Sequence, residues 1–273
     1  MEPLEQAFPR PAVVGIVNLS PDSFSGDGLP GAQAGVAQAR RLVAEGATLV
    51  DVGGESTRPG SDGVPLDEEL RRVVPVLEEV GHELRVSIDT SKAEVARRAL
   101  DLGAVLVNDV TALRGDPELA GVVAGSDAYL CLMHMLGEPR TMQDDPRYDD
   151  VVSDVAAFLE ERLEVATRAG IAEDAICVDP GIGFGKTVAH NLELLARLDE
   201  IVALGRPVLV GASRKRFLGR ALGDADALTG PVAAGVAVNV LSYERGASLF
   251  RVHDVRENVD ALAAAQALGG AAR

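Results

Sequence analysis

Polar and charged side chains that could do chemistry follow eight short apolar runs of this chain. The segments that carry them are 18–25, 51–60, 89–92, 108–109, 133–135, 179–186, 211–216 and 251–254. The opposite ends of the same runs, for example at Arg85 and Arg206, lack this density of polar groups. Such an asymmetry is typical of an enzyme whose site is assembled from the carboxyl ends of several strands.

Cationic side chains gather after the last two apolar runs. They are Arg214, Lys215, Arg251 and His253, and Arg58 from the second segment could join them. The whole chain has a net charge of −16, so these groups would form a local exception able to hold a phosphate or pyrophosphate. Ordinary surface ion pairs with the abundant carboxylates are the alternative interpretation.

Acceptor side chains end three of the other runs. Asp89, Asn108 and Asp179, pointing inward from their strands, would suit a flat, nitrogen-rich heterocycle with an amino-amide edge. The alternative for Asp89 and Asn108 is that they cap the helices that follow.

Oxygen ligands for a metal ion occur in the first segment, at Asn18, Asp22 and Asp27. Hard oxygen ligands near a pyrophosphate indicate Mg²⁺, and no His or Cys spacing indicates zinc. His134 and His190 have no assigned function and are expected to be structural, and Tyr148 and Tyr243 are expected to serve packing.

The elements that must position these groups alternate along the chain. We expect strands at residues 12–18, 49–53, 85–88, 106–108, 129–133, 176–179, 208–211 and 249–252. Helical spacing of apolar residues predicts helices at 34–45, 67–80, 93–102, 151–169, 191–203, 232–244 and 255–268. Pro75 predicts a kink or break, and Gly46, Gly103 and Gly170 occupy positions expected to end helices. Strict alternation over about 250 residues predicts a (β/α)₈ TIM barrel, with an open doubly wound sheet as the alternative.

Composition narrows the class of protein. With 47% hydrophobic and 25% charged residues, the 273-residue chain is an ordinary globular one, expected to form a single domain over residues 12–268 after an N-terminal extension, 1–11. No apolar run approaches the roughly 18 residues of a membrane span, and no signal peptide is evident, so we expect a cytoplasmic protein without a membrane partner. Its acidity and its 3% of aromatic residues argue against a nucleic-acid partner.

Cysteine and lysine usage add two observations. Cys131 and Cys177 lie inside apolar runs, which favours buried reduced thiols over a disulfide. There are only three lysines, Lys92, Lys186 and Lys215, and each lies near a predicted strand end. A genome that prefers arginine codons explains their scarcity but not their positions.

Together these segments resemble the dihydropteroate synthases, over residues 14–255. The motifs that carry the resemblance are NLSPDSFS from residue 18, DVGGESTRPG from 51, SIDT from 87, ND from 108, MH from 133, DPGIGFGK from 179, SRK from 213 and FRVHD from 250. Folate-dependent methyltransferases share the pterin-binding barrel but are not expected to show the segments at Thr57 and Ser213 in this form. They are one alternative, and a non-catalytic pterin-binding protein is the other.

The resemblance implies a transferase of folate biosynthesis and a sulfonamide target. It would condense 6-hydroxymethyl-7,8-dihydropterin diphosphate with p-aminobenzoate, releasing pyrophosphate and 7,8-dihydropteroate. It further implies Mg²⁺ as cofactor and a homodimer formed through outer helices. In the family an acidic residue directly follows the Ser-Phe-Ser of this first loop, whereas here Gly26 intervenes and Asp27 comes one position later.

The resemblance also implies a role for each matching position. The pterin would be held by Asp89, Asn108, Met133, Asp179, Lys215 and Arg251. The diphosphate would be held by Asn18, Thr57, Arg58, Arg251 and His253. The p-aminobenzoate site would be formed by Pro21, Phe24, Pro59, Phe184 and Ser213. Mg²⁺ would be bound by Asn18 and Asp27, and the chemistry would be supported by Asp89, Asp179 and Lys215.

Overall fold

Short buried strands alternate with helices along the chain, of which the computed structural model describes residues 1–20, 31–57, 61 and 63–271. The strands are β1 (Ala12–Asn18), β2 (Leu49–Gly53), β3 (Val86–Asp89), β4 (Leu106–Asp109), β5 (Tyr129–Met133), β6 (Ile176–Asp179), β7 (Leu209–Val210) and β8 (Leu249–Val252). The predicted strands are confirmed, with bounds that differ by one residue at β3, β4 and β7.

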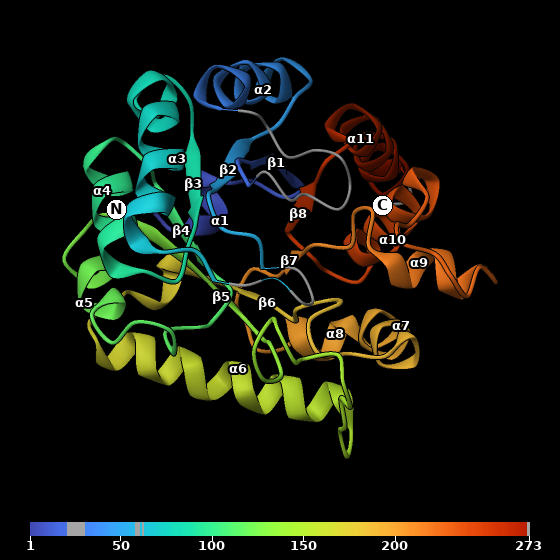
Figure 1. Cartoon of the computed structure of the whole chain (residues 1–273). Coiled ribbons are helices and arrows are strands. Elements are labelled where there is room, and N and C mark those ends of the chain that lie inside the picture. The colour runs from blue at the N-terminus through green and yellow to red at the C-terminus, as the bar shows by residue number, and fades with distance from the viewer. Residues whose placement is uncertain (21–30, 58–60, 62, 272–273) are drawn as a thin grey trace.

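The strands close into a barrel. They are parallel neighbours in the order β6-β5-β4-β3-β2-β1-β8-β7, and a parallel bridge between Val178 and Val208 joins the two ends. The Val178 N–H also donates to the carbonyl of Pro207 at 2.9 Å. The (β/α)₈ prediction is therefore confirmed and the open-sheet alternative is wrong. Figure 1 shows the helices surrounding the strands.

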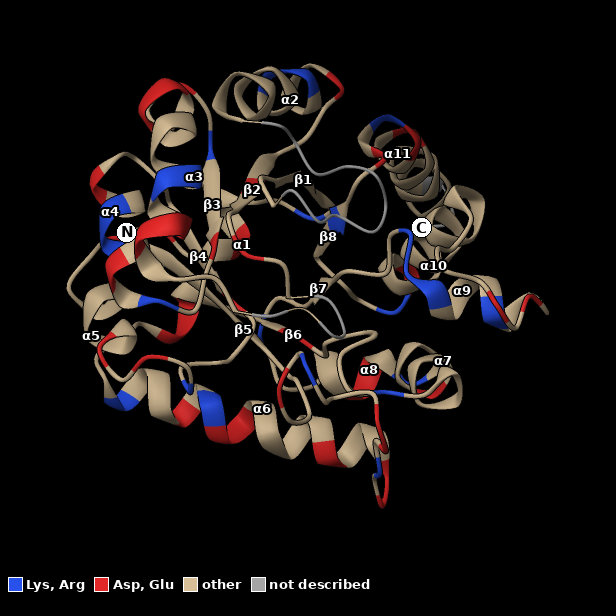
Figure 2. Cartoon of the chain, in the orientation of Figure 1, with Lys and Arg blue, Asp and Glu red and all other residues tan. Residues whose placement is uncertain are grey.

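The helices surround the barrel in chain order. Their bounds are α1 (Leu4–Ala7), α2 (Ala32–Ala44), α3 (Leu66–Val80), α4 (Ala93–Asp101), α5 (Leu119–Ala124), α6 (Val151–Arg168), α7 (Val188–Ala196), α8 (Leu198–Val202), α9 (Arg216–Ala221), α10 (Val232–Glu244) and α11 (Val255–Ala271), with a 3₁₀ turn at Glu173–Ala175. Sequence analysis missed α1, α5 and α9 because four to six residues are too few to show a helical period. Figure 2 shows charged residues mainly on these helices and on loops.

In the helices around the barrel, Pro75 does not end its helix, whereas three glycines follow helix ends. Helix α3 continues through Pro75, so the break that the sequence allowed is absent. Gly46, Gly103 and Gly170 adopt positive φ angles of 107°, 99° and 99° just after α2, α4 and α6. They end these helices as predicted, because glycine adopts this conformation without steric cost.

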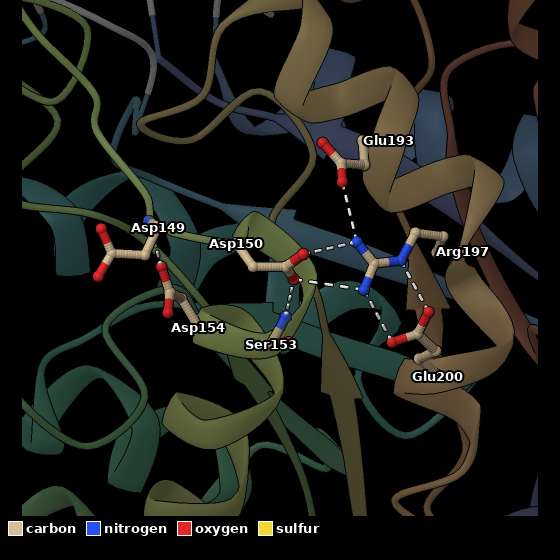
Figure 3. Close-up of polar contacts among 7 residues, drawn as sticks. All are labelled: Asp149, Asp150, Ser153, Asp154, Glu193, Arg197 and Glu200. Atoms are coloured by element: carbon tan, nitrogen blue, oxygen red, sulfur yellow. Dashed lines mark hydrogen bonds and ion pairs between the residues drawn. The ribbon is translucent and has the colours of Figure 1, made fainter.

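One expected helix, over residues 191–203, is two helices that meet at Arg197. The backbone there departs from helical geometry, with φ −109° and ψ 30°. Figure 3 shows its guanidinium between three carboxylates, at 2.8 Å from Asp150, 2.9 Å from Glu193 and 2.7 Å from Glu200. Asp150 also caps the start of α6. Arg197 therefore fixes the corner between α7 and α8 against the start of α6.

Alternation along the strands separates an outer apolar layer from the barrel interior. In β2, for example, Val50 and Val52 pack against the helices, whereas Leu49 and Asp51 lie on the other face. At the amino ends of the strands the interior is apolar, and Leu4 and Phe8 of the N-terminal segment fill it together with strand residues. Polar groups occupy the next inward positions, toward the carboxyl ends. Within the described residues, no helix is both long and apolar enough to cross a membrane.

Candidate active site

A cavity of about 490 Å³ opens at the carboxyl ends of the strands. Its wall includes eight of the residues that sequence analysis assigned to the site: Asn18, Thr57, Asp89, Phe184, Ser213, Lys215, Arg251 and His253. The barrel thus brings together residues that lie more than 200 positions apart in the chain. Asn108, Met133 and Asp179 are buried on the same inward strand face but are not part of the wall.

The floor of the cavity holds one arginine between two carboxylates. Arg251 Nε lies 2.6 Å from Asp51 Oδ2, and its terminal nitrogen lies 2.8 Å from Asp89 Oδ2. Asn108 donates to the same Asp51 oxygen at 3.1 Å. The second oxygens, Asp51 Oδ1 and Asp89 Oδ1, are buried and accept no hydrogen bond from the described residues. A buried carboxylate oxygen without a donor is costly. Of the two carboxylates only Asp89 lines the cavity, so Asp89 is the one suited to a ligand that brings N–H groups.

Burial dominates the titration of these acids. It raises the pKa of Asp89 from 3.8 to about 7, although the charge of Arg251 opposes the shift and that of Asp51 adds to it. Burial likewise raises the pKa of Asp179, opposed by Lys215 and by the N–H of Gly181, which donates to Asp179 Oδ1 at 2.7 Å.

The capping alternative for Asp89 and Asn108 is wrong. The first N–H of α4, at Ala93, donates to Asp116 Oδ2 at 2.9 Å, while Asp89 pairs with Arg251. The alternative of an ordinary ion pair holds for Arg214, whereas Arg251 pairs with Asp51 and Asp89 in the barrel interior. Arg214, with a positive φ of 55°, forms a two-point contact to Asp254 at 2.5 and 3.0 Å. Arg214 therefore supports the wall with its charge already paired.

Lys215 lies between the floor and the loop after β6. Its ammonium donates to the carbonyl of Ile182 and lies 4.5 Å from the ring centre of Phe184. Burial lowers the pKa of Lys215 to about 8, against the attraction of Asp179. Lys215 is therefore mostly protonated at pH 7, and it loses its proton about one pH unit higher.

The loop after β6 is held by a second buried lysine. Lys186, 3% exposed, donates to the carbonyls of Gly181 and Phe184 at 3.0 and 3.1 Å and contacts His134 Nδ1 at 2.8 Å. Burial and the charge of Lys186 lower the pKa of His134 to about 2, so the imidazole is the neutral acceptor. Burial lowers the pKa of Lys186 well below its ordinary value, although the charge of Asp179 opposes the shift. The three acceptors match the three N–H groups that the protonated amine offers.

The structural roles expected of these four residues are confirmed. His134 packs edge-on against Phe158 with ring centres 4.8 Å apart, and Tyr148 and Tyr243 are partly buried against the apolar core. His190 is structural in another way, because its Nδ1 accepts the Thr187 N–H in the capping box that starts α7.

Ser213 and His253 meet on the wall formed by β7 and β8. The hydroxyl of Ser213 accepts the backbone N–H of His253 at 3.2 Å and lies 3.1 Å from its Nδ1. The pair gives the cavity a hydroxyl and an imidazole beside Arg251. These groups could donate to anionic oxygens of a phosphate.

Asn18 is the only predicted metal ligand within the described residues. Its Oδ1 accepts the N–H and the hydroxyl of Ser20 at 3.0 and 2.8 Å. Among the described residues, no three His, Cys, Asp or Glu side chains form a metal-binding group. This donor set fits Mg²⁺ held mainly by phosphate oxygens with one protein oxygen, once the Ser20 hydroxyl rotates away.

Six candidate residues lie outside the described part of the chain: Pro21, Asp22, Phe24, Asp27, Arg58 and Pro59. Their predicted roles at the aminobenzoate, diphosphate and metal positions stay predictions.

Comparison with known proteins decides the family. The pterin-binding enzyme family matches residues 14–253. A dihydropteroate synthase of Neisseria meningitidis serogroup C is 44% identical, covering 97% of this chain and 95% of its own. The chain belongs to the dihydropteroate synthase family. It is accordingly a transferase of folate biosynthesis, and the resemblance seen in the sequence is confirmed.

Solved dihydropteroate synthases share the fold as well. A Yersinia pestis enzyme in complex with a sulfonamide drug aligns with a TM-score of 0.91 at 42% identity, covering 96% of this chain and 95% of its own. A Burkholderia cenocepacia enzyme complexed with 7,8-dihydropteroate aligns with a TM-score of 0.85 at 45% identity, covering 97% and 94%. These relatives favour neither the methyltransferase nor the non-catalytic alternative.

Sequence analysis missed two contributors to this dihydropteroate synthase site. Asp51 was quoted within a motif without a role, although alternation with Leu49 in β2 points it inward. The contact of Lys186 with His134 joins residues 52 positions apart, which no local pattern shows. The sequence did carry one indication for Lys186, because it is one of only three lysines and each of them lies near a predicted strand end.

Proposed function

We propose that this site condenses 6-hydroxymethyl-7,8-dihydropterin diphosphate with p-aminobenzoate to form 7,8-dihydropteroate and pyrophosphate. The observation that carries the proposal is the cavity floor, where Arg251 joins Asp51 and Asp89 and leaves a buried oxygen of each carboxylate without a donor. The amino-amide edge of a pterin supplies N–H groups of the kind that Asp89 Oδ1 lacks, and Asp89 lines the cavity.

The pterin would lie on this floor. Asp89 Oδ1 would accept an N–H of the ring, and Lys215 would donate to its carbonyl. Arg251 would lie over the ring face, where a guanidinium stacks favourably. Accepting an N–H favours the ionised carboxylate, so binding would lower the raised pKa of Asp89.

The diphosphate would lie toward the opening. Thr57, Ser213 and His253 line this part of the cavity, and Asn18 lies at the end of β1. We propose Mg²⁺ as the cofactor here, with Asn18 as its ligand, because the donor set fits an ion held chiefly by phosphate oxygens. When bound, it would neutralise charge that develops on the diphosphate oxygens.

The reaction follows from the charges of the site. The bond between the pterin methylene carbon and the bridging oxygen breaks, and its electron pair leaves with the diphosphate. Ionised Asp89 and Asp179 would stabilise the cationic pterin electrostatically. The amine of p-aminobenzoate then forms the new carbon–nitrogen bond and releases one proton to water. An arylamine needs no strong base for this attack, so the proposal assigns no catalytic triad.

Phe184 and Ser213 would form the described part of the p-aminobenzoate site. Both line the cavity; the ring centre of Phe184 lies 4.5 Å from the Lys215 ammonium, and the Phe184 carbonyl accepts a hydrogen bond from Lys186. The first test is direct: the purified chain is incubated with the pterin diphosphate, Mg²⁺ and p-aminobenzoate. Dihydropteroate and pyrophosphate in equal amounts are expected, and their absence would overturn the proposal.

We further propose a homodimer formed through α10. Ala234 and Val238 of this helix pack against the apolar core, and yet Val232 and Leu241 on the same helix are 38% and 54% exposed. An apolar outer face of this kind is suited to a second copy of the chain. Sedimentation should give a dimer that Leu241→Arg converts to monomer; a monomeric parent chain would contradict the assignment.

The cytoplasm is the compartment that we propose. Cys131 and Cys177 are register partners on β5 and β6, and both are buried free thiols, as predicted. Adjacent reduced thiols suit a reducing compartment.

A further inference from the structure

A buried carboxylate, a lysine and a second carboxylate connect α3 to the cavity wall. Glu69 of α3 is 0% exposed; its Oε1 accepts the Thr90 hydroxyl at 2.7 Å and its Oε2 pairs with the Lys92 ammonium at 2.5 Å. Lys92, the residue just before α4, also pairs with Glu55. Glu55, Ser56 and Thr57 follow β2 and line the cavity.

The second contact of Lys92 is not needed for helix packing. One carboxylate, Glu69, already neutralises Lys92 and joins α3 to the start of α4. Glu55 belongs to neither helix, and its side chain is 22% exposed on the loop after β2. Because two carboxylates share one ammonium, removing Lys92 would leave like charges facing each other and push the loop away.

Other contacts hold the same loop at its base. Arg72 of α3 donates to the carbonyl of Gly54 at 2.7 Å. A side chain on Gly54 would come within 3.0 Å of both Val73 and Glu69, so the loop rests directly on α3. Beyond Gly54, Glu55 has its described ion pair with Lys92, and Ser56 and Thr57 follow at once.

We infer that Lys92 is a positioning residue, which bridges Glu69 to Glu55 and thereby fixes Ser56 and Thr57 where they meet the diphosphate end of the substrate. This inference rests on the proposed function for the identity of the ligand. Lys92 itself does not line the cavity and takes no part in the bond changes. Its effect should fall on the diphosphate and not on the pterin ring, which Asp89 and Lys215 would contact.

The test compares two ligands in four proteins. Calorimetry measures the affinity for the pterin diphosphate and for 6-hydroxymethylpterin, which lacks the diphosphate, in the parent chain, Lys92→Met, Glu55→Gln and Arg97→Met. Arg97 is the matched control, since it pairs with Glu94 on the exposed face of α4. Loss of a charged contact predicts about tenfold weaker binding of the diphosphate in Lys92→Met and Glu55→Gln. Binding of hydroxymethylpterin should stay within about twofold of the parent value.

Each alternative outcome is decisive. Equal weakening of both ligands would mean that Lys92 merely supports the fold, and unchanged diphosphate binding would remove its role altogether. Glu55→Gln leaves the Lys92–Glu69 pair intact, so it keeps the test valid if Lys92→Met fails to fold. Lys92→Arg should restore most of the lost affinity. Since the comparison measures binding, it stands apart from the turnover assay, whose failure would overturn the proposed function alone.

Discussion

The Lys186 ammonium lies 2.8 Å from Nδ1 of His134, and both side chains are at least 95% buried. The two residues belong to different strand-end loops, after β6 and after β5. Since Lys186 also donates to the carbonyl of Phe184, the position of that ring depends on the contact between the loops.

Replacing Lys186 by methionine should therefore weaken p-aminobenzoate more than pterin. The variant leaves the Phe184 carbonyl and the His134 imidazole nitrogen without the Lys186 donor, whereas the Gly181 carbonyl keeps the Phe184 N–H. It should therefore also lower the free energy of unfolding by roughly 2–3 kcal/mol. Steady-state kinetics should show a KM for p-aminobenzoate raised about tenfold, with the KM for pterin diphosphate changed far less. Equal increases in both KM values would contradict a role in placing Phe184.

Pterin affinity should depend on pH through two groups of the floor. Asp89 is ionised only above its pKa of about 7, and Lys215 is charged only below its pKa of about 8. Affinity for 6-hydroxymethylpterin should therefore be greatest between these values and fall on either side. Calorimetry from pH 5.5 to 9, about the range that separates these states, should show the acid-side fall in the parent chain and not in Asp89→Asn.

The free energy of unfolding should also depend on pH through the carboxyl group of Asp89. Between pH 3.8 and about 7 the folded protein keeps a proton on Asp89 that the unfolded chain has already lost. The free energy of unfolding should accordingly decrease as pH rises through this range. Asp89→Asn removes that contribution, so its Tm relative to the parent should be higher at pH 8 than at pH 5. A constant difference in Tm would show that Asp89 titrates normally.

Lys215→Arg should not be a conservative change. Lys215 fits between Asp179 and the Ile182 carbonyl as a compact ammonium, and a wider guanidinium should displace the pterin. Turnover should fall by about a hundredfold, as expected when an electrostatic donor is misplaced. The comparison uses a folded variant whose Tm matches the parent; near-normal turnover would reduce Lys215 to part of the general positive field.

Asn18→Ala should raise the Mg²⁺ concentration required for half-maximal pyrophosphate binding by about tenfold. Ser20→Ala is the informative partner variant. It frees the Asn18 oxygen from the Ser20 hydroxyl and should lower that concentration. Calorimetric titration of pyrophosphate at several Mg²⁺ concentrations measures both. The same Mg²⁺ dependence in all three proteins would exclude Asn18 as the ligand.

The sequence predicted the barrel because each strand is a short apolar run with a polar group at its carboxyl end. Alternation within the strands then places Asp89, Asn108 and Arg251 inward together. The contacts of Lys186 with His134 and of Lys92 with Glu69 could not be predicted. Each joins side chains from separate segments, and their approach depends on how the loops and helices pack around the barrel. Helix α10 was predicted, but its residues are apolar nearly all round, so the sequence did not show which face is buried.

The N-terminal segment determines from which end of the barrel ligands can enter and leave. Leu4 and Phe8 fill the amino end of the interior, so the described barrel has a single mouth. A ligand bound on the floor leaves the opening free for a second ligand. A ligand bound nearer the opening closes the path by which a second ligand reaches the floor. If the substrates lie as proposed, we expect the pterin diphosphate to bind before p-aminobenzoate and pyrophosphate to leave before dihydropteroate. Excess p-aminobenzoate, added before the pterin diphosphate, should slow turnover, because it would occupy the opening of the cavity before the pterin has bound.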